Sequence, residues 1–277
     1  MLQVSDVWFG YDERRPALKG VTVAIRPDAV VGILGPNGSG KTTLLRVLTG
    51  TRRPQRGSVT LDGAPLSTTR RAALARKVAV VPQETQLAFD YTVAEVAMMG
   101  RYPHLAAFEV EGPADVAAVD EALASTGTLA LKDRLFATLS GGEKQRVVIA
   151  AALAQIGSFR AKTDAADAES RFLLLDEPTA SLDLAYQLEI GALLARLHAE
   201  RRAGIVISTH DIGLAGTLCD TLVLLRDGAI VAAGPTDQVL TPDYLRAVYG
   251  VDTEITRHAS GQRVVVAIRR STAGPPP

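Results

Sequence analysis

The chain of 277 residues contains one cysteine, Cys219, and carries no net charge. A single cysteine cannot build an internal disulfide framework or a zinc site of the usual four-ligand Cys type, and it fits a reducing compartment. We expect Cys219 to be a small core residue without a redox or metal-binding role. Thirty Lys and Arg residues balance thirty Asp and Glu residues. The sequence therefore has no basic surplus that would indicate a nucleic-acid partner. It also has no acidic surplus that would indicate a disordered tail.

Long apolar runs are also absent. The longest runs, such as residues 147–154, fall well short of the ~18 to 20 apolar residues that a membrane-spanning helix needs. The N-terminus has no basic stretch followed by a long apolar run, so no signal peptide is predicted and we expect a cytoplasmic protein. With 47% hydrophobic and 22% charged residues, the chain can bury a full core. Its length fits one large domain, or one domain with a substantial subdomain.

Short apolar runs predict the strands. Apolar and polar side chains alternate in the first thirty-odd residues, which predicts two or three antiparallel strands around a turn at residues 11–16. Continuous apolar runs predict buried strands at residues 30–34, 78–81 and 172–175. Further strands are predicted at residues 205–208 and 222–225. Helical spacing dominates residues 93–155. The sequence therefore predicts a mixed α/β core interrupted by a helical insert.

Four segments are predicted as turns, loops or tails. Asp227-Gly228 favours a β-hairpin, because such turns need positive φ angles. Gly100 is expected to end a helix, followed by a turn that contains Pro103. Residues 157–171 are small and polar and predict a surface loop, and residues 271–277, with three terminal prolines, predict a disordered tail.

The clearest motif is a glycine-rich segment between a predicted buried strand and a predicted helix. It matches the pattern G-x-x-x-x-G-K-[ST] and consists of Gly35, Pro36, Asn37, Gly38, Ser39, Gly40, Lys41 and Thr42. Glycines let backbone N–H groups wrap phosphate oxygens, and the N-terminus of the following helix adds positive potential. Lys41 would contact the β- and γ-phosphates, and the Thr42 hydroxyl would ligate Mg²⁺.

A second motif supplies the acids that such a loop needs. Residues 172–175 are apolar and lead directly into Asp176 and Glu177. The carboxyl end of a buried strand delivers side chains to the ligand crevice of an α/β sheet. Asp176 could hold Mg²⁺ directly or through water, and Glu177 could polarise the water that attacks the γ-phosphate. Together the two motifs predict a nucleoside triphosphatase.

A third motif, Ser140-Gly141-Gly142, precedes a predicted helix. Its backbone N–H groups could receive a phosphate. Taken alone, Ser140 and Glu143 favour an ordinary helix N-cap, because S-x-x-E is a capping box. The position of the motif between the glycine-rich loop and the Asp-Glu strand favours the phosphate role instead.

The order of these three motifs resembles the ATP-binding cassette (ABC) ATPases, and the resemblance covers residues 1 to about 250. It implies a P-loop NTPase core of RecA-like fold with an N-terminal antiparallel β subdomain and an inserted α-helical subdomain. It places the ATP-binding core at residues 1–86 and 160–255 and the helical subdomain at residues 87–159. A C-terminal extension with a disordered tail occupies residues 256–277.

The resemblance also implies roles for single residues. Tyr11 would stack on adenine, and Thr43 would join the nucleotide-binding loop. Gln83 is similar to the glutamine that senses Mg²⁺ and the attacking water near the membrane partner. Asp183 lies in a segment similar to the loop through which two subunits communicate, and His210 is similar to the switch histidine that contacts the γ-phosphate.

The implied mechanism needs two copies of the chain. ATP bound by the Lys41 loop of one subunit would be covered by the Ser140 motif of another, in a head-to-tail dimer with two ATP molecules at the interface. ATP would clamp the halves together, and hydrolysis, with Glu177 as catalytic base, would release them. Because every motif is intact, a homodimer with two equivalent sites is expected.

The sequence leaves three possible uses for such an ATPase. The first is the energy-coupling subunit of a membrane importer with two separate polytopic permease subunits and an external substrate-binding protein. The second is the ATPase of an exporter or lipid-extraction system. The third is a soluble role in DNA repair, translation or cofactor assembly. Neutral charge, one cassette and the short spacing between the motifs argue against nucleic-acid work.

Within transporters, the string Gly100-Arg101-Tyr102-Pro103-His104 resembles the ATPases of importers for iron-siderophores, haem and cobalamin. Residues 236–242 and 249–251 resemble the same group. A lengthened loop at residues 157–171 slightly favours haem, but a surface insertion without function explains it at least as well, because such loops tolerate extra length at little cost. The resemblance implies that a short permease helix docks near Gln83 and residues 91–101, and that the chain lies on the cytoplasmic face of the inner membrane.

Overall fold

The structure is a computed structural model that describes residues 1–12, 15–157, 170–180, 182–200, 203–259 and 263–271. The chain forms two compact units. The first comprises Met1–Ser67 and Gly204–Pro277, and the second comprises Thr68–Ala203. The functional domain boundaries expected from the sequence, at residues 86/87 and 159/160, remain a prediction.

An antiparallel sheet begins the first unit. Its strands are β1 (Leu2–Asp12), β2 (Arg15–Ile25), β4 (Arg56–Leu61) and β5 (Ala64–Pro65), in the order β2-β1-β4-β5. The predicted antiparallel strands are confirmed, with buried Leu2, Val4 and Val7 on the core face. The predicted turn at residues 11–16 is too wide, because β1 and β2 remain paired as far as Asp12 and Arg15.

The same unit contains the strand that leads into the glycine-rich loop. This strand, β3 (Val30–Leu34), pairs in parallel with β8 (Gly204–Thr209) and with β9 (Thr221–Arg226). Every residue of β3 and β8 is buried, as expected of strands covered on both faces. β9 continues into the antiparallel strand β10 (Ala229–Pro235) through Asp227 and Gly228, whose φ angles of 50° and 82° confirm the predicted hairpin turn.

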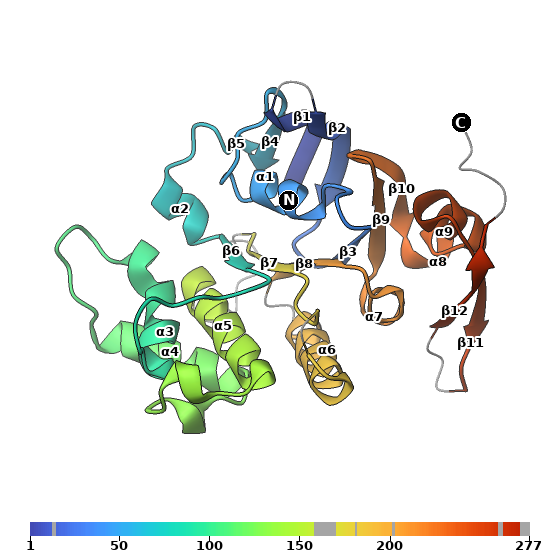
Figure 1. Cartoon of the computed structure of the whole chain (residues 1–277). Helices are drawn as coiled ribbons and strands as arrows, with labels where there is room; N and C mark the ends of the chain where they lie inside the picture. Colours follow the sequence, from blue (N-terminus) through green and yellow to red (C-terminus); the bar gives the residue numbers. More distant parts are fainter. Residues whose placement is uncertain (13–14, 158–169, 181, 201–202, 260–262, 272–277) are drawn as a thin grey trace. The chain divides into compact units, whose positions relative to one another are not determined.

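Four helices complete the first unit around these strands (Figure 1). They are α1 (Lys41–Leu48), α7 (Ile212–Leu218), α8 (Thr236–Val239) and α9 (Pro242–Tyr249). Helix α1 follows β3 directly after the glycine-rich loop. Buried Cys219 ends α7, and its Sγ lies where a side chain on Gly32 would have to be, which explains the glycine inside β3. Cys219 is a core residue, as expected.

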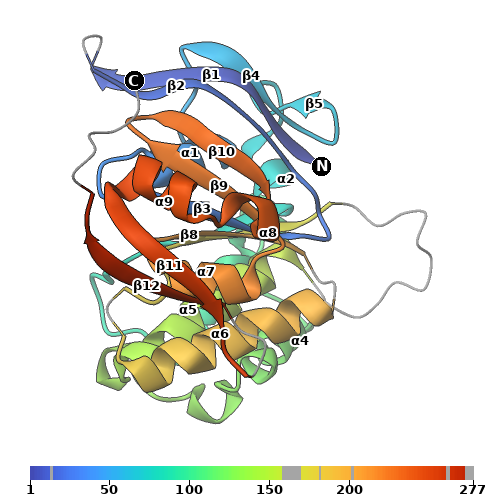
Figure 2. The ribbon, with the colours of Figure 1, turned by 90° about the vertical axis from the view of Figure 1, so that its right-hand side faces the viewer.

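The C-terminal region contains a hairpin that the sequence analysis did not predict. Strands β11 (Val251–Arg257) and β12 (Arg263–Arg270) form an antiparallel hairpin beside α9 (Figure 2). The Asp252 carboxylate accepts hydrogen bonds from Arg246 at 2.7 Å and Arg269 at 3.0 Å, which fastens both strands to α9. Ser271 still donates its N–H to the Gly250 carbonyl, so order extends into the first residue of the predicted tail. The rest of that predicted tail, residues 272–277, lies outside the described residues.

The second unit combines two parallel strands with the predicted helices. Strand β6 (Val78–Val81) pairs with β7 (Phe172–Asp176). The helices are α2 (Arg71–Ala75), α3 (Val93–Met98), α4 (Pro113–Ser125), α5 (Gly141–Ile156) and α6 (Leu184–Ala199), with short 3₁₀ helices η1 (Met99–His104), η2 (Leu129–Leu131) and η3 (Phe136–Thr138). Helix α5 is the centre of this unit, because α3, α4 and η1 all pack against it.

Gly100 corrects one expectation. It lies inside η1, and no turn starts there, because the 3₁₀ helix includes Pro103 and continues to His104. A Cβ on Gly100 would lie 2.1 Å from the carbonyl oxygen of Ala151, so this glycine lets η1 approach the backbone of α5. Most of the predicted loop at residues 157–171 lies outside the described residues. Among the described helices, none is both long and apolar enough to cross a membrane.

Candidate nucleotide-binding site

The glycine-rich loop joins the end of β3 to the start of α1, as its sequence predicts. Gly40 is the N-cap of α1, with φ 107°, and no side chain caps the helix. No acidic residue lies in the first turn. The first N–H groups of α1 therefore carry positive potential without an internal carboxylate to neutralise it, which suits an anionic group.

The glycine-rich loop contains a buried side-chain oxygen that lacks a hydrogen-bond partner among the described residues. The Ser39 hydroxyl is buried and makes no hydrogen bond with any described residue. A Cβ on Gly38, whose φ is 79°, would meet no described residue within 4 Å. An unsatisfied hydroxyl is costly unless a ligand supplies its partner. The residues of the loop thus fit a bound phosphate.

Lys41 and the turn between β9 and β10 hold the loop in shape. The Lys41 Nζ donates to the carbonyl oxygen of Gly35 at 2.9 Å, so the ammonium group lies across the loop. The N–H of Gly228 donates to the Ser39 carbonyl at 3.0 Å, and the Gly228 carbonyl accepts from Lys19. A Cβ on Gly35 would lie 2.2 Å from the Leu225 carbonyl oxygen, which makes glycine necessary there.

Tyr11 lies at the edge of this site and is held by four neighbours. Its hydroxyl accepts a hydrogen bond from Arg46 at 2.9 Å and lies 3.4 Å from the Thr43 hydroxyl. The Phe9 ring packs edge-on at 5.1 Å, and the Arg52 guanidinium lies 5.8 Å from the centre of the Tyr11 ring. Burial alone would raise the pKa of Tyr11, but the bonds with Thr43 and Arg46 lower it overall. The ring is 56% exposed, so a planar base could stack on it.

His210 leaves β8 at the edge where the glycine-rich loop leaves β3. The two strands are parallel, and Leu34 pairs with Thr209. The next residues along each strand, Gly35 and His210, therefore emerge at the same carboxyl edge. This is where ligands bind in open α/β sheets. His210 is exposed at this edge.

In the second unit the predicted acids also follow a parallel strand pair. Val81 of β6 pairs with Leu175 of β7, so Gln83, Asp176 and Glu177 emerge at one edge. Asp176 is buried, and Glu177 has a left-handed φ of 47°. Such a conformation costs a non-glycine residue about 1–3 kcal/mol and is concentrated at functional sites.

A cleft of about 290 Å³ within this unit joins three of the predicted site residues. Gln83, Gly141 and Glu177 all line it. The Gln145 side chain also lines it, and its Nε2 is buried without a hydrogen-bond partner among the described residues. The sequence analysis missed Gln145, although it lies only three residues after the Gly-Gly pair.

Ser140 has the capping role that the isolated motif favoured. Its hydroxyl accepts from the Glu143 N–H, and the Glu143 carboxylate accepts from the Ser140 N–H at 2.8 Å. This backbone hydrogen bond lowers the pKa of Glu143. The capping box leaves the N–H groups of Gly141 and Gly142 at the start of α5, so the cap and the predicted phosphate role are compatible.

Gly142 is explained by packing. A Cβ there would lie 2.2 Å from the Tyr186 ring, whereas a Cβ on Gly141 would meet, among the described residues, Leu182 alone, at 3.3 Å. Asp183 is the N-cap of α6, and its carboxylate accepts from the N–H of Tyr186 at 3.1 Å. Its predicted role between subunits stays a prediction.

Arg46, Arg52, Tyr186 and Tyr249 also escaped the sequence analysis, because nothing in the local pattern marks them. Tyr249 ends α9, and its buried hydroxyl lies beside the backbone of Gly35 without a hydrogen bond of ordinary geometry. Burial raises the pKa of Tyr249 to about 12, despite the opposing effect of the Gly35 backbone. Only the fold brings this residue to the glycine-rich loop.

Comparison with known proteins defines the class of this site. The family model of the ABC transporters matches residues 18–180. This match covers more than half of the chain, and the chain belongs to the ABC transporter family. It has the ABC ATPase fold and is an ATP-hydrolysing member of that family.

Individual relatives are similar over most of their length. The hemin import ATP-binding protein HmuV of Bordetella pertussis is 42% identical over 91% of this chain and 94% of its own. The cobalamin import ATP-binding protein BtuD of Halobacterium salinarum is 38% identical over 92% of this chain and 61% of its own. Among solved structures, a metal-chelate type ABC transporter in an inward-facing conformation aligns with a TM-score of 0.80 and 26% identity, over 96% of both chains.

Proposed function

We propose that this chain is the energy-coupling subunit of a membrane importer for an iron chelate (haem or a siderophore) or cobalamin. The observation that carries the proposal is the 42% identity to a hemin import ATP-binding protein across nearly all of both chains. Among the importer substrates, haem is favoured, because a second hemin import protein, from Gloeobacter violaceus, is 44% identical over 87% of this chain.

The proposed roles in ATP hydrolysis follow from the chemistry of each residue. The glycine-rich loop and Lys41 hold the phosphates, and Tyr11 stacks on the base. Glu177 would orient and deprotonate the attacking water, and Gln83 and His210 would contact the water and the γ-phosphate. A Mg²⁺ ion held by Thr42, Gln83 and Asp176 would neutralise charge that develops on the phosphate oxygens.

The remaining steps need partners. We propose that two copies act together, with Ser140, Gly141, Gly142 and Asp183 of one copy covering the ATP bound by the other. A dimeric bacterial ABC transporter cassette, 26% identical with a TM-score of 0.70, supports this arrangement. Two permease subunits and an external substrate-binding protein would complete the importer on the cytoplasmic face of the membrane.

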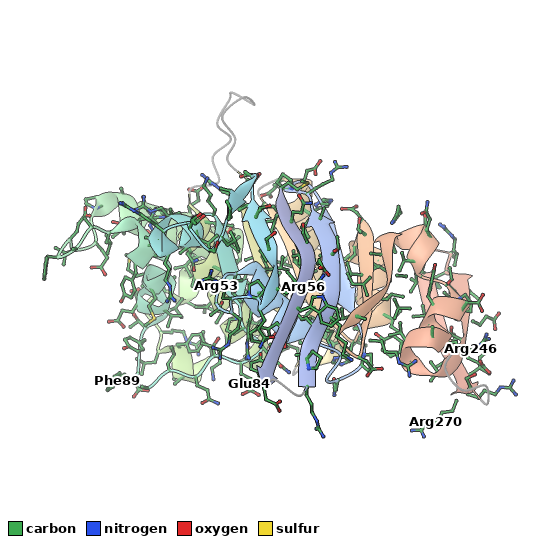
Figure 3. All side chains as sticks on the ribbon, turned by 90° about the horizontal axis from the view of Figure 1, so that it is seen from above. Arg53, Arg56, Glu84, Phe89, Arg246 and Arg270 are labelled. Carbon is green, nitrogen blue, oxygen red and sulfur yellow. The ribbon has the colours of Figure 1, made fainter. Side chains whose placement is uncertain are left out.

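The permease contact is proposed in a second cleft, of about 410 Å³, lined in part by residues that come shortly after Gln83 in the sequence. Leu87, Ala88 and Phe89 line one part of it, and Phe136 lines another. Phe89 is 72% exposed, and Figure 3 shows its labelled side chain at the outer edge of the ribbon, farther out than Glu84. The cleft also contains the charged side chains Asp90 and Lys144. A cleft that combines these charges with apolar side chains and the exposed Phe89 ring is suited to receive a short amphipathic helix.

The decisive experiment is purification of the tagged chain with its membrane partner, followed by reconstitution in lipid vesicles. We expect a polytopic permease to co-purify, and ATP hydrolysis to rise when a binding protein loaded with haem is enclosed. Stimulation by cobalamin or a ferric siderophore alone would change the substrate and keep the importer. Recovery with an exporter-type membrane subunit, or with no membrane protein, would reject the proposal.

A further inference from the structure

The segment that joins η1 to α4 exposes apolar side chains. Between residues 102 and 116 four large ones are exposed, and Phe108 and Val110 are 106% and 80% accessible. Figure 1 shows this stretch as an extended loop that leaves the helices of its unit. We call residues 105–112 the Phe108 loop. Scattered apolar side chains on a surface need no explanation, but a local concentration indicates a binding site.

The Phe108 loop is held in a strained shape. Phe108 has a φ of 67°, in the left-handed region that a bulky L-residue rarely adopts. The Glu109 carboxylate accepts from the Ala106 N–H at 2.6 Å, and the Glu109 N–H donates to the Ala106 carbonyl at 3.1 Å. These local bonds fix the turn that presents Phe108 to solvent.

The end of the loop is also anchored. The Asp115 carboxylate accepts from the N–H of Gly112 at 3.0 Å and from the Nε of Arg101 at 2.9 Å. Both partners lower the pKa of Asp115, the Gly112 N–H first and Arg101 second. The bond from Arg101 ties the start of α4 to η1. These hydrogen bonds hold the loop in a projecting conformation, and Phe108 therefore keeps its exposed position.

The charge of the loop has one sign. Residues 105–116 contain Glu109, Glu111 and Asp115 and no Lys or Arg. Asp115 is neutralised by Arg101, which leaves two carboxylates flanking Val110. An apolar side chain between carboxylates is complementary to an apolar pocket with a basic rim.

We propose that the Phe108 loop is a second contact with the permease, where Phe108 and Val110 enter an apolar pocket rimmed by Lys or Arg of a cytoplasmic permease loop. This inference rests on the proposed importer function. Cytoplasmic loops of membrane proteins carry an excess of Lys and Arg, which gives the charge complementarity. An anionic lipid surface would repel Glu109 and Glu111, and a contact between two copies of the loop would bring carboxylates together.

The test compares binding of full-length variants to the co-purified permease in lipid nanodiscs. Phe108→Gly removes the side chain and suits the positive φ, so the loop keeps its shape. Val110→Ser removes the second apolar contact, and Glu111→Lys reverses one charge. We expect each variant to bind about tenfold more weakly, the loss caused by removing one buried anchor. For the wild type, and not for Glu111→Lys, affinity should fall steeply with salt. Basal ATP hydrolysis should be unchanged in all three.

A matched control is Ile268→Ser, which removes a 60% exposed side chain from β12 in the other unit and should bind like the wild type. Equal affinity of the wild type and Phe108→Gly would overturn the inference and leave the importer function intact. Failure of the wild type to bind any permease would reject the importer function as well. Phe108-dependent binding to anionic vesicles without permease would replace the permease by a lipid surface and overturn the inference.

Discussion

Individual side chains carry most of the chemistry proposed for this ATPase, and the proposed role of Glu177 can be tested most directly. Directly after β7, Glu177 has a left-handed φ of 47° and lines a cleft together with Gln83. A glutamine at this position keeps the shape of the glutamate side chain, but its amide cannot accept a proton from water. The proposed role as a general base therefore depends on the Glu177 carboxylate alone.

Glu177→Gln should lower ATP turnover by about 10²–10⁴, the usual contribution of a positioned general base. ATP binding should persist, because the glycine-rich loop is untouched. Turnover can be followed by phosphate release and binding by a fluorescent ATP analogue. Hydrolysis at the wild-type rate would show that Glu177 is not the base.

Tyr11 shows how neighbours tune one residue. The bond from Arg46 should fix the ring for stacking, so Arg46→Ala should raise the KM for ATP several-fold with little change in kcat. The same change should raise the pKa of Tyr11, because Arg46 contributes to lowering it. The lowered folded pKa contributes stability that is fully present above the usual pKa of ~10 and is lost as the pH falls through the folded value.

Ultraviolet titration of tyrosine in wild type, Arg46→Ala and Tyr11→Phe would measure this shift. The Tyr11→Phe protein identifies the signal of Tyr11 among the six tyrosines. An unchanged Tyr11 titration in Arg46→Ala would mean that the hydrogen bond does not act in solution.

At the scale of elements, the junction of α5 and α6 depends on a close approach. The Tyr186 ring occupies the space that a side chain on Gly142 would need. Gly142→Ala should therefore lower the free energy of unfolding by about 1–3 kcal/mol, as overpacking of a dense interior does. Gly141→Ala is a matched control on the same turn, because its Cβ would meet Leu182 at 3.3 Å.

Denaturant unfolding of both variants would measure the difference. If Gly142→Ala also carries Tyr186→Ala, the loss should be smaller than the sum of the two single losses. Equal stabilities of Gly141→Ala and Gly142→Ala would contradict the packing explanation and leave only a phosphate-binding role for Gly142.

Elements differed in how well the sequence predicted them. Buried strands such as β3 and β7 were predicted because continuous apolar runs with glycine or acidic ends are distinctive. The glycine-rich loop and the Asp176-Glu177 pair were predicted for the same reason, since they are local patterns. The C-terminal hairpin was missed, because its order depends on Asp252 binding two arginines. Contacts made by folding, such as Tyr249 beside Gly35 or Tyr186 beside Gly142, have no local pattern at all.

For the whole molecule, Cys219 offers a probe of folding. It is buried against Gly32, and burial raises its pKa to about 12. Thiol reagents attack the thiolate, so the folded protein should react very slowly at neutral pH. After unfolding the cysteine should react at the rate of a free thiol. Because the chain has only this cysteine, labelling during denaturation, read by mass spectrometry, should report the opening of the first unit.

A control with bound nucleotide would sharpen this measurement. ATP should slow labelling, because ligand binding to the folded state lowers the open population. Rapid labelling of the native protein, without denaturant, would contradict the buried position of Cys219.

The pairing of β3 has a consequence for how the chain is made. Its neighbours β8 and β9 lie about 170 residues or more further along the chain, and Gly228, which supports the glycine-rich loop, comes later still. During synthesis from the N-terminus, β1, β2 and β4 can pair early, whereas the strand before the loop must wait for almost the whole chain. We therefore expect the glycine-rich loop to be completed only after residue 228 has been synthesised. Bound ATP can stabilise the folding chain only from that point on.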